Sequence, residues 1–370
     1  MIRLAAVPVM AAFLLPSTVS HATQTQEKPQ FKVGVQNRTL TVDQPYDWRG
    51  AATHALTTVI WYPAEAAAVE KPQWIGPSQS PLFSAGSAAP EAPLVASPAK
   101  FPLIVLSHGT GGSALSIAWI GTALAAHGYI AAAVNHPGNN ATEAYTAQGF
   151  STWWERARDL SVVIDRMLAD PTFGPRIDSH RIGAEGFSLG GYTMIEIAGG
   201  TTDVDAYLAF CKSPRADAIC QSPPEFPDLV GQFNKLRDTD PEFQAALRHA
   251  GDSYRDPRVR AVFALAPALG PAFTPASLRR IAIPVEIVAG ASDPIVPLAS
   301  SARYFAAHIP GAKLVILPGG VAHYTFLDSC TDAGRKRLPQ LCADAPDVNR
   351  DAIHARANDL ALGFFAAHLK

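Results

Sequence analysis

The sequence has few charged side chains and almost no net charge. Asp, Glu, Lys and Arg make up 17% of the 370 residues, and the formal net charge at pH 7 is −2. No run of Lys or Arg occurs, so we expect no nucleic-acid partner. The chain also lacks an H-E-x-x-H motif, a His/Cys cluster and a glycine-rich phosphate loop before a lysine, so neither a metal nor a cofactor is expected. The 48% of hydrophobic residues is ordinary for one large α/β domain with insertions.

Long apolar runs are absent except near the N-terminus. There, Arg3 precedes the apolar segment Leu4–Leu15, which is too short for a comfortable membrane span, and small residues flank the expected cut. This pattern predicts a secretory signal peptide over residues 1–22, cleaved after Ala22, with an uncleaved membrane anchor as the alternative. Residues 23–370 would then form a single exported domain, periplasmic or secreted, without a transmembrane segment.

Cysteine is scarce, and its four positions lie in two close pairs. None has the C-x-x-C spacing of a metal or redox site, and an even number of cysteines in an exported chain favours disulfides. Sequence neighbours are the expected partners, because closing a short loop costs the least entropy. We therefore predict the disulfides Cys211–Cys220 and Cys330–Cys342, with free buried thiols as the alternative.

From residue 103 onward, apolar runs alternate with amphipathic segments. An uninterrupted apolar run is typical of a parallel strand covered on both faces, so the alternation predicts a mostly parallel central sheet with helices on both faces. The expected strands are Leu103–Ser107, Tyr129–Val134, Arg181–Phe187, Val259–Leu265, Val285–Ala289 and Lys313–Leu317. The expected helices are Ala114–His127, Thr152–Ala169, Leu189–Ala198, Leu298–His308 and Asp351–Leu369. Antiparallel opening strands are expected at Phe31–Val35 and Ala55–Tyr62.

Two long segments do not fit this alternation. Pro72–Pro98 is rich in Pro, Ser, Ala and Gly, which predicts an irregular surface loop and a candidate wall of the site. Gly200–Arg258 is much longer than a plain crossover needs, and it contains an amphipathic piece at Pro241–Ala250. We interpret residues 200–258 as a lid-like insertion, with a structural decoration remote from the site as the alternative.

The segment Arg181–Gly191 reads as a short buried strand that ends abruptly in a helix, with Ser188 at the corner. Its G-x-S-x-G pattern is the nucleophile elbow, which holds a serine on a sharp strand-to-helix turn. The two arms of such a turn nearly touch, so Gly186 and Gly190 supply the room that side chains would take. Ser188 is therefore the candidate nucleophile.

A serine nucleophile needs a base, and the base needs an acid that orients it. The chain order expected with this elbow is nucleophile, acid, histidine. Asp293 lies just past the carboxyl end of the predicted strand Val285–Ala289 and precedes a proline, and His323 follows the next strand after a glycine-rich turn. We assign Asp293 as the acid and His323 as the base. Taken singly, each also fits an ordinary turn residue.

The oxyanion of a tetrahedral intermediate needs two backbone N–H donors. Leu189, directly after the nucleophile, is the first candidate. The loop after Leu103–Ser107 contains His108 and three glycines, a version of the HGGG-type motif, and Thr110 is the expected second donor, with Gly109 or Gly111 as alternatives. We interpret His108, like His136 past the following strand, as structural.

Together these motifs resemble the bacterial predicted dienelactone hydrolases, a group of α/β hydrolases related to platelet-activating-factor acetylhydrolases and, more distantly, to cutinase-like polyester-degrading enzymes. The resemblance runs from about residue 57 to the C-terminus and is weakest over residues 200–258. It implies the α/β-hydrolase fold and a serine esterase or lipase-type activity without a cofactor. True dienelactone hydrolases use a cysteine nucleophile, whereas this chain has Ser188. The residues that carry the resemblance are Ser107–Gly112, Asn135–Gly138, Gly186–Gly191 and Ala289–Pro294.

The expected function is an exported serine hydrolase that cleaves small-molecule or lipid-like carboxylic esters through a Ser-His-Asp triad and an acyl-enzyme. One alternative is an acyltransferase that uses the same triad but passes the acyl group to an alcohol. A lipase or polyester hydrolase is a second alternative, and a peptidase is also compatible with the fold. A non-catalytic binding module would be marked by loss of a triad member, and all three residue types are here.

Overall fold

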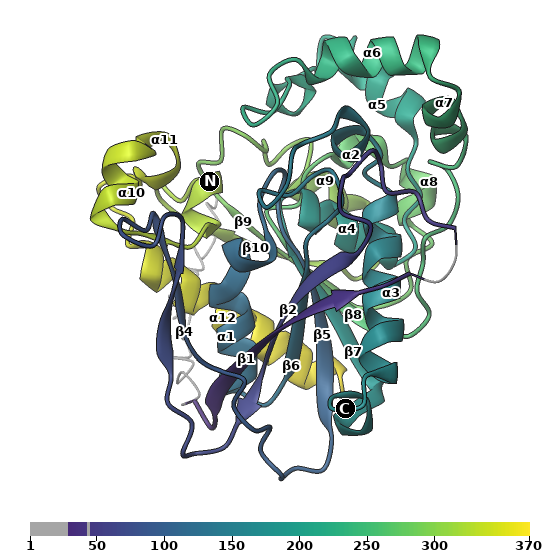
Figure 1. The fold of residues 1–370 in the computed structure, drawn as a ribbon. Coiled ribbons are helices and arrows are strands. Elements are labelled where there is room, and N and C mark those ends of the chain that lie inside the picture. Colours follow the sequence, from purple (N-terminus) through teal and green to yellow (C-terminus); the bar gives the residue numbers. More distant parts are fainter. Residues whose placement is uncertain (1–28, 43–44) are drawn as a thin grey trace, which may run out of the picture.

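The computed structural model describes residues 29–42 and 45–370. The predicted signal peptide, residues 1–22, lies outside these ranges. In the described residues eleven strands form one sheet in the order β10-β9-β8-β7-β5-β6-β2-β1-β4-β11, with β3 paired to β4 (Figure 1). The strands are β1 (Lys32–Leu40), β2 (Leu56–Ala64), β3 (Lys71–Ile75), β4 (Phe83–Pro90), β5 (Phe101–Ser107), β6 (Ile130–Val134), β7 (Ile177–Phe187), β8 (Val259–Leu265), β9 (Val285–Gly290), β10 (Lys313–Leu317) and β11 (Ser329–Cys330).

The central part of the sheet is parallel, from β6 through β5, β7, β8 and β9 to β10. β2 runs antiparallel to both β6 and β1, so the N-terminal strands extend the sheet as an antiparallel edge. The predicted antiparallel opening strands and six parallel strands are thus present, and the expected fold class is observed. Parallel strands place their carboxyl ends at one edge, where loops bring ligand-binding groups together.

Helices cover both faces of the sheet. The α-helices are α1 (Ala118–Ala126), α2 (Ala147–Ser151), α3 (Glu155–Ala169), α4 (Leu189–Ile197), α5 (Val204–Cys211), α6 (Leu229–Thr239), α7 (Pro241–Arg248), α8 (Pro275–Leu278), α9 (Ala302–His308), α10 (Asp332–Arg337), α11 (Pro339–Cys342) and α12 (Arg350–His368). Single 3₁₀ turns are η1 (Ala114–Ile117), η2 (Gly174–Arg176), η3 (Ala218–Cys220), η4 (Gly270–Ala272) and η5 (His323–Phe326).

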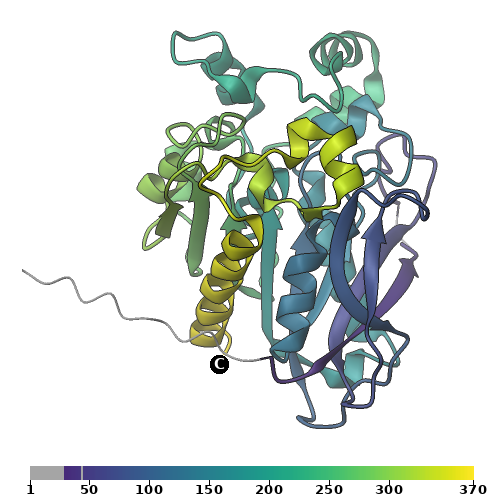
Figure 2. The same ribbon diagram turned by 90° about the vertical axis from the view of Figure 1, so that its left-hand side faces the viewer.

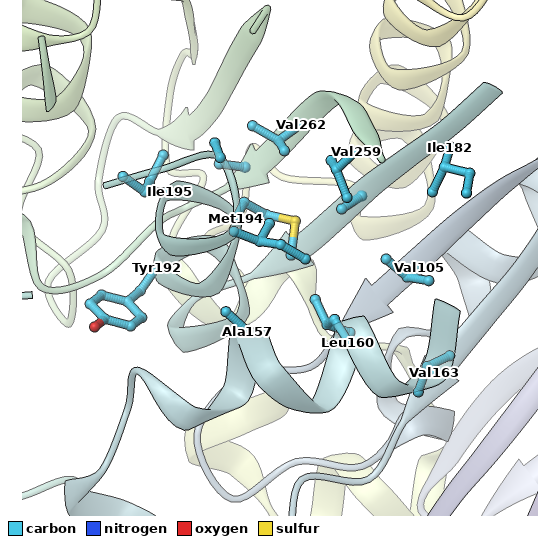
Figure 3. Packing of buried hydrophobic residues seen from close by; sticks show 14 of the residues in the cluster. Val105, Ala157, Leu160, Val163, Ile182, Tyr192, Met194, Ile195, Val259 and Val262 are labelled. Atoms are coloured by element: carbon cyan, nitrogen blue, oxygen red, sulfur yellow. The ribbon is translucent and has the colours of Figure 1, made fainter. Parts of the chain in front are cut away.

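The alternation of side chains along each strand separates two hydrophobic cores. In β5, Leu103 and Val105 belong to the core under α3 and α4, whereas Ile104 and Leu106 belong to the core under α1 and α12. Figure 3 shows side chains of α3 and α4 gathered against β5, β7 and β8 in the first core. Figure 2 shows α12 beside α1 on the other face. Because both faces are covered, the central stretches of the parallel strands are mostly apolar, whereas the N-terminal part of β7 (Asp178–Arg181) is polar.

The prediction of an irregular loop over Pro72–Pro98 is wrong, because β3 and β4 lie within it. The small residues that suggested a loop are required by close packing: Ala85 and Ala88 are fully buried. Gly86 has φ +77°, and a Cβ there would lie 3.4 Å from Thr122 Oγ1 of α1. Pro72 is tolerated because β3 pairs only with β4 and forms an edge.

Residues 200–258 contain α5, η3, α6 and α7, which lie at the top of Figure 1. The amphipathic piece predicted over Pro241–Ala250 is α7. Both predicted disulfides are present: Cys211–Cys220 closes the loop after α5, and Cys330–Cys342 joins β11 to α11. The structure therefore has a covalent constraint in this insertion and another near the C-terminal helices.

Reduction is expected to lower the stability of the folded chain. Each disulfide closes a short loop, with sequence separations of 9 and 12 residues, so each contributes about 2–3 kcal/mol by restricting the unfolded chain. With a melting entropy of roughly 2 cal/mol/K per residue, that is about 4 °C in Tm for each bond. Thermal melting of Cys211→Ala/Cys220→Ala and Cys330→Ala/Cys342→Ala double variants, with and without reductant, measures each bond separately. An unchanged Tm in both variants would contradict the expectation.

Candidate active site

Ser188 occupies a strained turn between β7 and α4. Its backbone has φ +58° and ψ −115°, in a region that residues with a side chain rarely adopt. The neighbouring strand holds this turn, because the Ser188 amide donates to Leu265 O at 2.9 Å. The Ser188 carbonyl accepts from the Ala268 amide at 3.1 Å. A strained backbone that the surrounding structure fixes so firmly is typical of a functional site.

The glycines around Ser188 are there because the backbones approach closely. A Cβ on Gly190 would lie 1.9 Å from Ser107 O, and one on Gly186 would lie 2.4 Å from Gly190 O. Neither partner is a flexible side chain that could give way. The spacing of the G-x-S-x-G motif therefore follows directly from the packing of β5, β7 and α4.

Asp293, His323 and Ser188 lie in one hydrogen-bonded chain. His323 Nδ1 lies 2.7 Å from Asp293 Oδ2, and His323 Nε2 lies 2.9 Å from Ser188 Oγ. A carboxylate only accepts, so Nδ1 carries the proton and Nε2 is free to accept from the serine hydroxyl. The exposed fractions of Ser188, Asp293 and His323 are 7%, 9% and 3%, so these three side chains are largely shielded from water.

The loops after β9 and β10 position the acid and the base. Asp293 Oδ1 accepts from the amides of Ile295 and Val296 at 2.9 and 2.8 Å, which fixes the carboxylate while Oδ2 faces the imidazole. The His323 ring lies against the Phe187 ring, with the centroids 4.9 Å apart. Each of the three side chains thus follows a parallel strand at its carboxyl end, as the sequence pattern predicts.

The amides of Thr110 and Leu189 border the same cavity as Ser188 and His323. Leu189 is the first residue of α4, where the N–H has no partner within the helix. Within residues 29–42 and 45–370, neither amide donates a hydrogen bond to the protein. The Gly111 amide, in contrast, donates to Asn139 Oδ1 at 2.7 Å and is thereby occupied. Of the two alternatives to Thr110, Gly111 is therefore the less suitable donor.

A cavity of about 570 Å³ opens over Ser188. Ile75 and Phe83 from the β3–β4 hairpin form part of its wall, so that hairpin borders the site as the sequence analysis anticipated. Tyr207, Ile219 and Glu225 from the insertion form another part. The insertion thus contacts the cavity rather than lying remote from it. Most of the remaining lining is apolar or aromatic, which suits the hydrocarbon part of a small organic molecule.

A buried polar network under the oxyanion loop was not anticipated from the sequence. Asp159 of α3 receives both Nη2 hydrogen bonds of Arg49, at 2.8 and 2.9 Å, and lies 2.7 Å from His136 Nδ1. His136 Nε2 lies 2.9 Å from Ser107 Oγ at the end of β5. Arg49 and Asp159 are far apart in the sequence and belong to no shared motif. Their pairing could therefore be found only from the fold.

The two histidines near the loop serve this network, in agreement with their interpretation as structural. The His136 amide donates to His108 Nε2 at 3.3 Å, so His108 carries its proton on Nδ1 and donates it to Gly109 O at 2.7 Å. Arg156 donates to His108 O. Burial, with the positive charge of Arg156, holds the pKa of both histidines well below the usual value. Both rings are neutral braces of the loop that presents Thr110.

The described parts of the chain give no candidate for metal chemistry. In residues 29–42 and 45–370, no three His, Cys, Asp or Glu side chains are grouped so that they could hold a metal ion. In the same ranges, no helix has the length and apolar character needed to cross a membrane.

Three comparisons with known proteins bear on this site. Residues 84–166, which include Thr110 and Asp159, match the family model described as platelet-activating factor acetylhydrolase, isoform II. Cutinase est1 of Thermobifida alba is 33% identical over 107 residues, which are 28% of this chain and 33% of the cutinase. Lipase 1 of Moraxella sp. (strain TA144) is 32% identical over 93 residues, which are 25% of this chain and 26% of the lipase. The matched part of the chain spans a third or less of these relatives.

The similarity in structure is more extensive than the similarity in sequence. The solved structure of a ferulic acid esterase from Streptomyces cinnamoneus matches with a TM-score of 0.62 and 20% identity, and the match covers 92% of this chain and 91% of the esterase. The two chains share one fold over the matched residues. These findings confirm the fold class and the family resemblance predicted from the sequence motifs.

Proposed function

We propose that this chain, which has the α/β-hydrolase fold, is a serine hydrolase that cleaves carboxylic esters. The observation that carries the proposal is the hydrogen-bonded chain from Asp293 through His323 to Ser188 at the floor of the cavity. The similarity to a cutinase and a lipase supports an ester as the bond that is cleaved. The esterase with the same fold supports only the architecture.

In the proposed reaction, Ser188 Oγ attacks the ester carbonyl carbon while His323 Nε2 takes the hydroxyl proton. Asp293 keeps the imidazole in the tautomer that can accept this proton and stabilises the imidazolium that forms. The tetrahedral intermediate collapses when His323 returns the proton to the leaving alkoxide, which departs as an alcohol. Water then attacks the acyl-enzyme by the same route and releases the carboxylic acid.

The amides of Thr110 and Leu189 are the proposed donors to the oxyanion. A donor of this kind is worth about 3 kcal/mol in the transition state, because it is already oriented before charge develops. The positive end of α4 points at the same place. The network of Arg49, Asp159 and His136 supports these donors indirectly, since it fixes the end of β5 from which the Thr110 loop departs.

We further propose that the protein is exported, with residues 1–22 as its signal peptide and residues 200–258 as a lid over the cavity. Two disulfides support an oxidising compartment. A lipase or polyester hydrolase is favoured as the second candidate by the mostly apolar lining of the cavity and by the relatives' names.

The test is an ester-cleavage assay on the purified chain. With 4-nitrophenyl butyrate we expect equal amounts of 4-nitrophenol and butyric acid, together with stoichiometric labelling of Ser188 by a fluorophosphonate. An added alcohol distinguishes the acyltransferase, because that activity would yield a new ester in place of the acid. Absence of both cleavage and labelling in a folded preparation would reject the proposal.

A further inference from the structure

The insertion carries one carboxyl group, that of Glu225, into the cavity above Ser188. Its backbone is held in place from two directions. Pro223 and Pro224 precede it, and the Phe226 amide donates to Pro223 O at 2.9 Å to close a turn. The Phe226 ring packs edge-on against the buried Phe150 ring, with the centroids 5.1 Å apart. Glu225 is therefore a positioned residue of the cavity wall.

The Glu225 side chain lies against the oxyanion loop. A Cβ placed on Gly111 would be 3.0 Å from Glu225 Cγ and 3.0 Å from Tyr145 Oη. The Tyr145 hydroxyl donates to Gly111 O at 2.8 Å, which keeps this stretch of backbone in place. The Glu225 side chain therefore packs beside the loop of the proposed donor Thr110, in the cavity that Ser188 also lines.

No lysine or arginine of the cavity lining balances this group. Among the described residues that line the cavity there is neither a lysine nor an arginine. Burial raises the pKa of the Glu225 carboxyl, while His323 acts in the opposite direction. Burial raises the pKa values of Tyr145 and Tyr324, and the charge of Glu225 raises both further.

A second carboxyl in the lining, Asp328, differs from Glu225 in its surroundings. Asp328 is 1% exposed, and burial holds its pKa well above the usual value, which favours the neutral acid. Its Oδ1 accepts from the Trp119 amide at 3.4 Å, away from the reacting serine. Glu225 is thus the acidic side chain of the lining that can present a charge next to the oxyanion loop.

We propose that Glu225 is a specificity-determining residue, which lets the site accept neutral and cationic esters and reject esters with an anionic group near the reacting carbonyl. This inference rests on the proposed ester hydrolysis. An anionic substrate would meet a like charge in a mostly apolar cavity whose described lining has no lysine or arginine, and such contacts are unfavourable. A cationic group would instead gain a partner that the free enzyme lacks.

The test compares matched esters in wild type and Glu225→Gln, which keeps the size of the side chain and removes its charge. One series varies the acyl group as 4-nitrophenyl hexanoate, hydrogen adipate and 6-aminohexanoate. A second varies the leaving group as butyryl thioesters with a neutral, carboxylate or trimethylammonium end. In at least one series, Glu225→Gln is expected to raise the anionic-to-neutral ratio of kcat/KM about tenfold and to lower the cationic-to-neutral ratio about tenfold.

Two further variants separate charge from structure. Glu225→Asp keeps the charge and is expected to retain the wild-type order of preference. Glu242→Gln, at an exposed position of α7 in the same insertion, makes the same change in net charge and is expected to leave all ratios unchanged. Ratios that move less than twofold in both series would overturn the proposal while neutral esters are still cleaved. If the wild-type protein does not cleave neutral esters, the proposed function itself is rejected.

Discussion

Replacement of Ser188 by alanine is expected to lower kcat for 4-nitrophenyl butyrate by roughly a million-fold, to the level set by binding and the oxyanion donors alone. The change removes the atom that forms the acyl-enzyme, while His323 and Asp293 keep their hydrogen bond. Steady-state kinetics at saturating substrate measures the effect, and fluorophosphonate labelling should disappear with it. Activity within tenfold of wild type would remove Ser188 from the mechanism.

Two companion variants make this result specific. Ser213→Ala removes a hydroxyl in the insertion that donates to Phe210 O at 2.7 Å, outside the cavity lining, and should leave kcat unchanged. Ser188→Gly should be as inactive as Ser188→Ala yet more stable by about 1 kcal/mol, because glycine adopts φ +58° without steric strain. A thermal melt compares the two variants. A higher Tm for Ser188→Gly than for Ser188→Ala would show that the backbone conformation at residue 188 lowers the stability of the folded chain.

Asp293→Asn is expected to reduce kcat about ten-thousand-fold although the side chain hardly changes shape. The amides of Ile295 and Val296 both donate to Asp293 Oδ1, so an asparagine would keep its oxygen there and turn its NH₂ toward His323. Two donors would then face each other, and the imidazole would move its proton to Nε2. In that tautomer Nε2 cannot accept the proton of Ser188.

The control for this variant is a second histidine–carboxylate pair on the surface. His249 Nδ1 lies 2.8 Å from Asp252 Oδ2, nearly the same distance as in the pair of His323 and Asp293, but both side chains are exposed. Asp252→Asn should leave kcat unchanged. A rate for Asp293→Asn within tenfold of wild type would point to another acid. A loss of the folded state would be detected by thermal melting before the kinetics are interpreted.

Local sequence patterns were sufficient for the parallel sheet and the three candidate catalytic side chains. Each strand of the sheet centre contains a short apolar run; Ser188 follows β7 directly, and Asp293 and His323 lie in the loops after β9 and β10. Parallel strands carry their ends to one edge, so the position in the sequence already determines the position in space. The same patterns failed for β4. Its small residues pack against α1, and the sequence around β4 gives no indication of that contact.

Residues whose partners lie far away in the sequence could also not be identified from the sequence alone. Asp159 lies mid-helix with no motif around it, and its contacts come from Arg49 and His136 on two other segments. Glu225 is one acidic residue among many in the insertion, and only the turn at Pro223 brings it over Gly111. Their roles depend on which surfaces meet after folding, and one sequence does not contain that information.

Neither disulfide lines the cavity, but each adjoins a residue that does: Cys220 precedes Gln221, and Cys342 follows Leu341. Cys211–Cys220 borders the stretch that ends at Glu225, whereas Ser188, Asp293 and His323 follow strands of the central sheet. The candidate triad and the proposed specificity residue Glu225 are thus held in place by different parts of the fold. If the chain is the proposed ester hydrolase, reduction of the two disulfides would leave the candidate triad in place but loosen segments that adjoin the cavity, so discrimination between esters is expected to fall before kcat does.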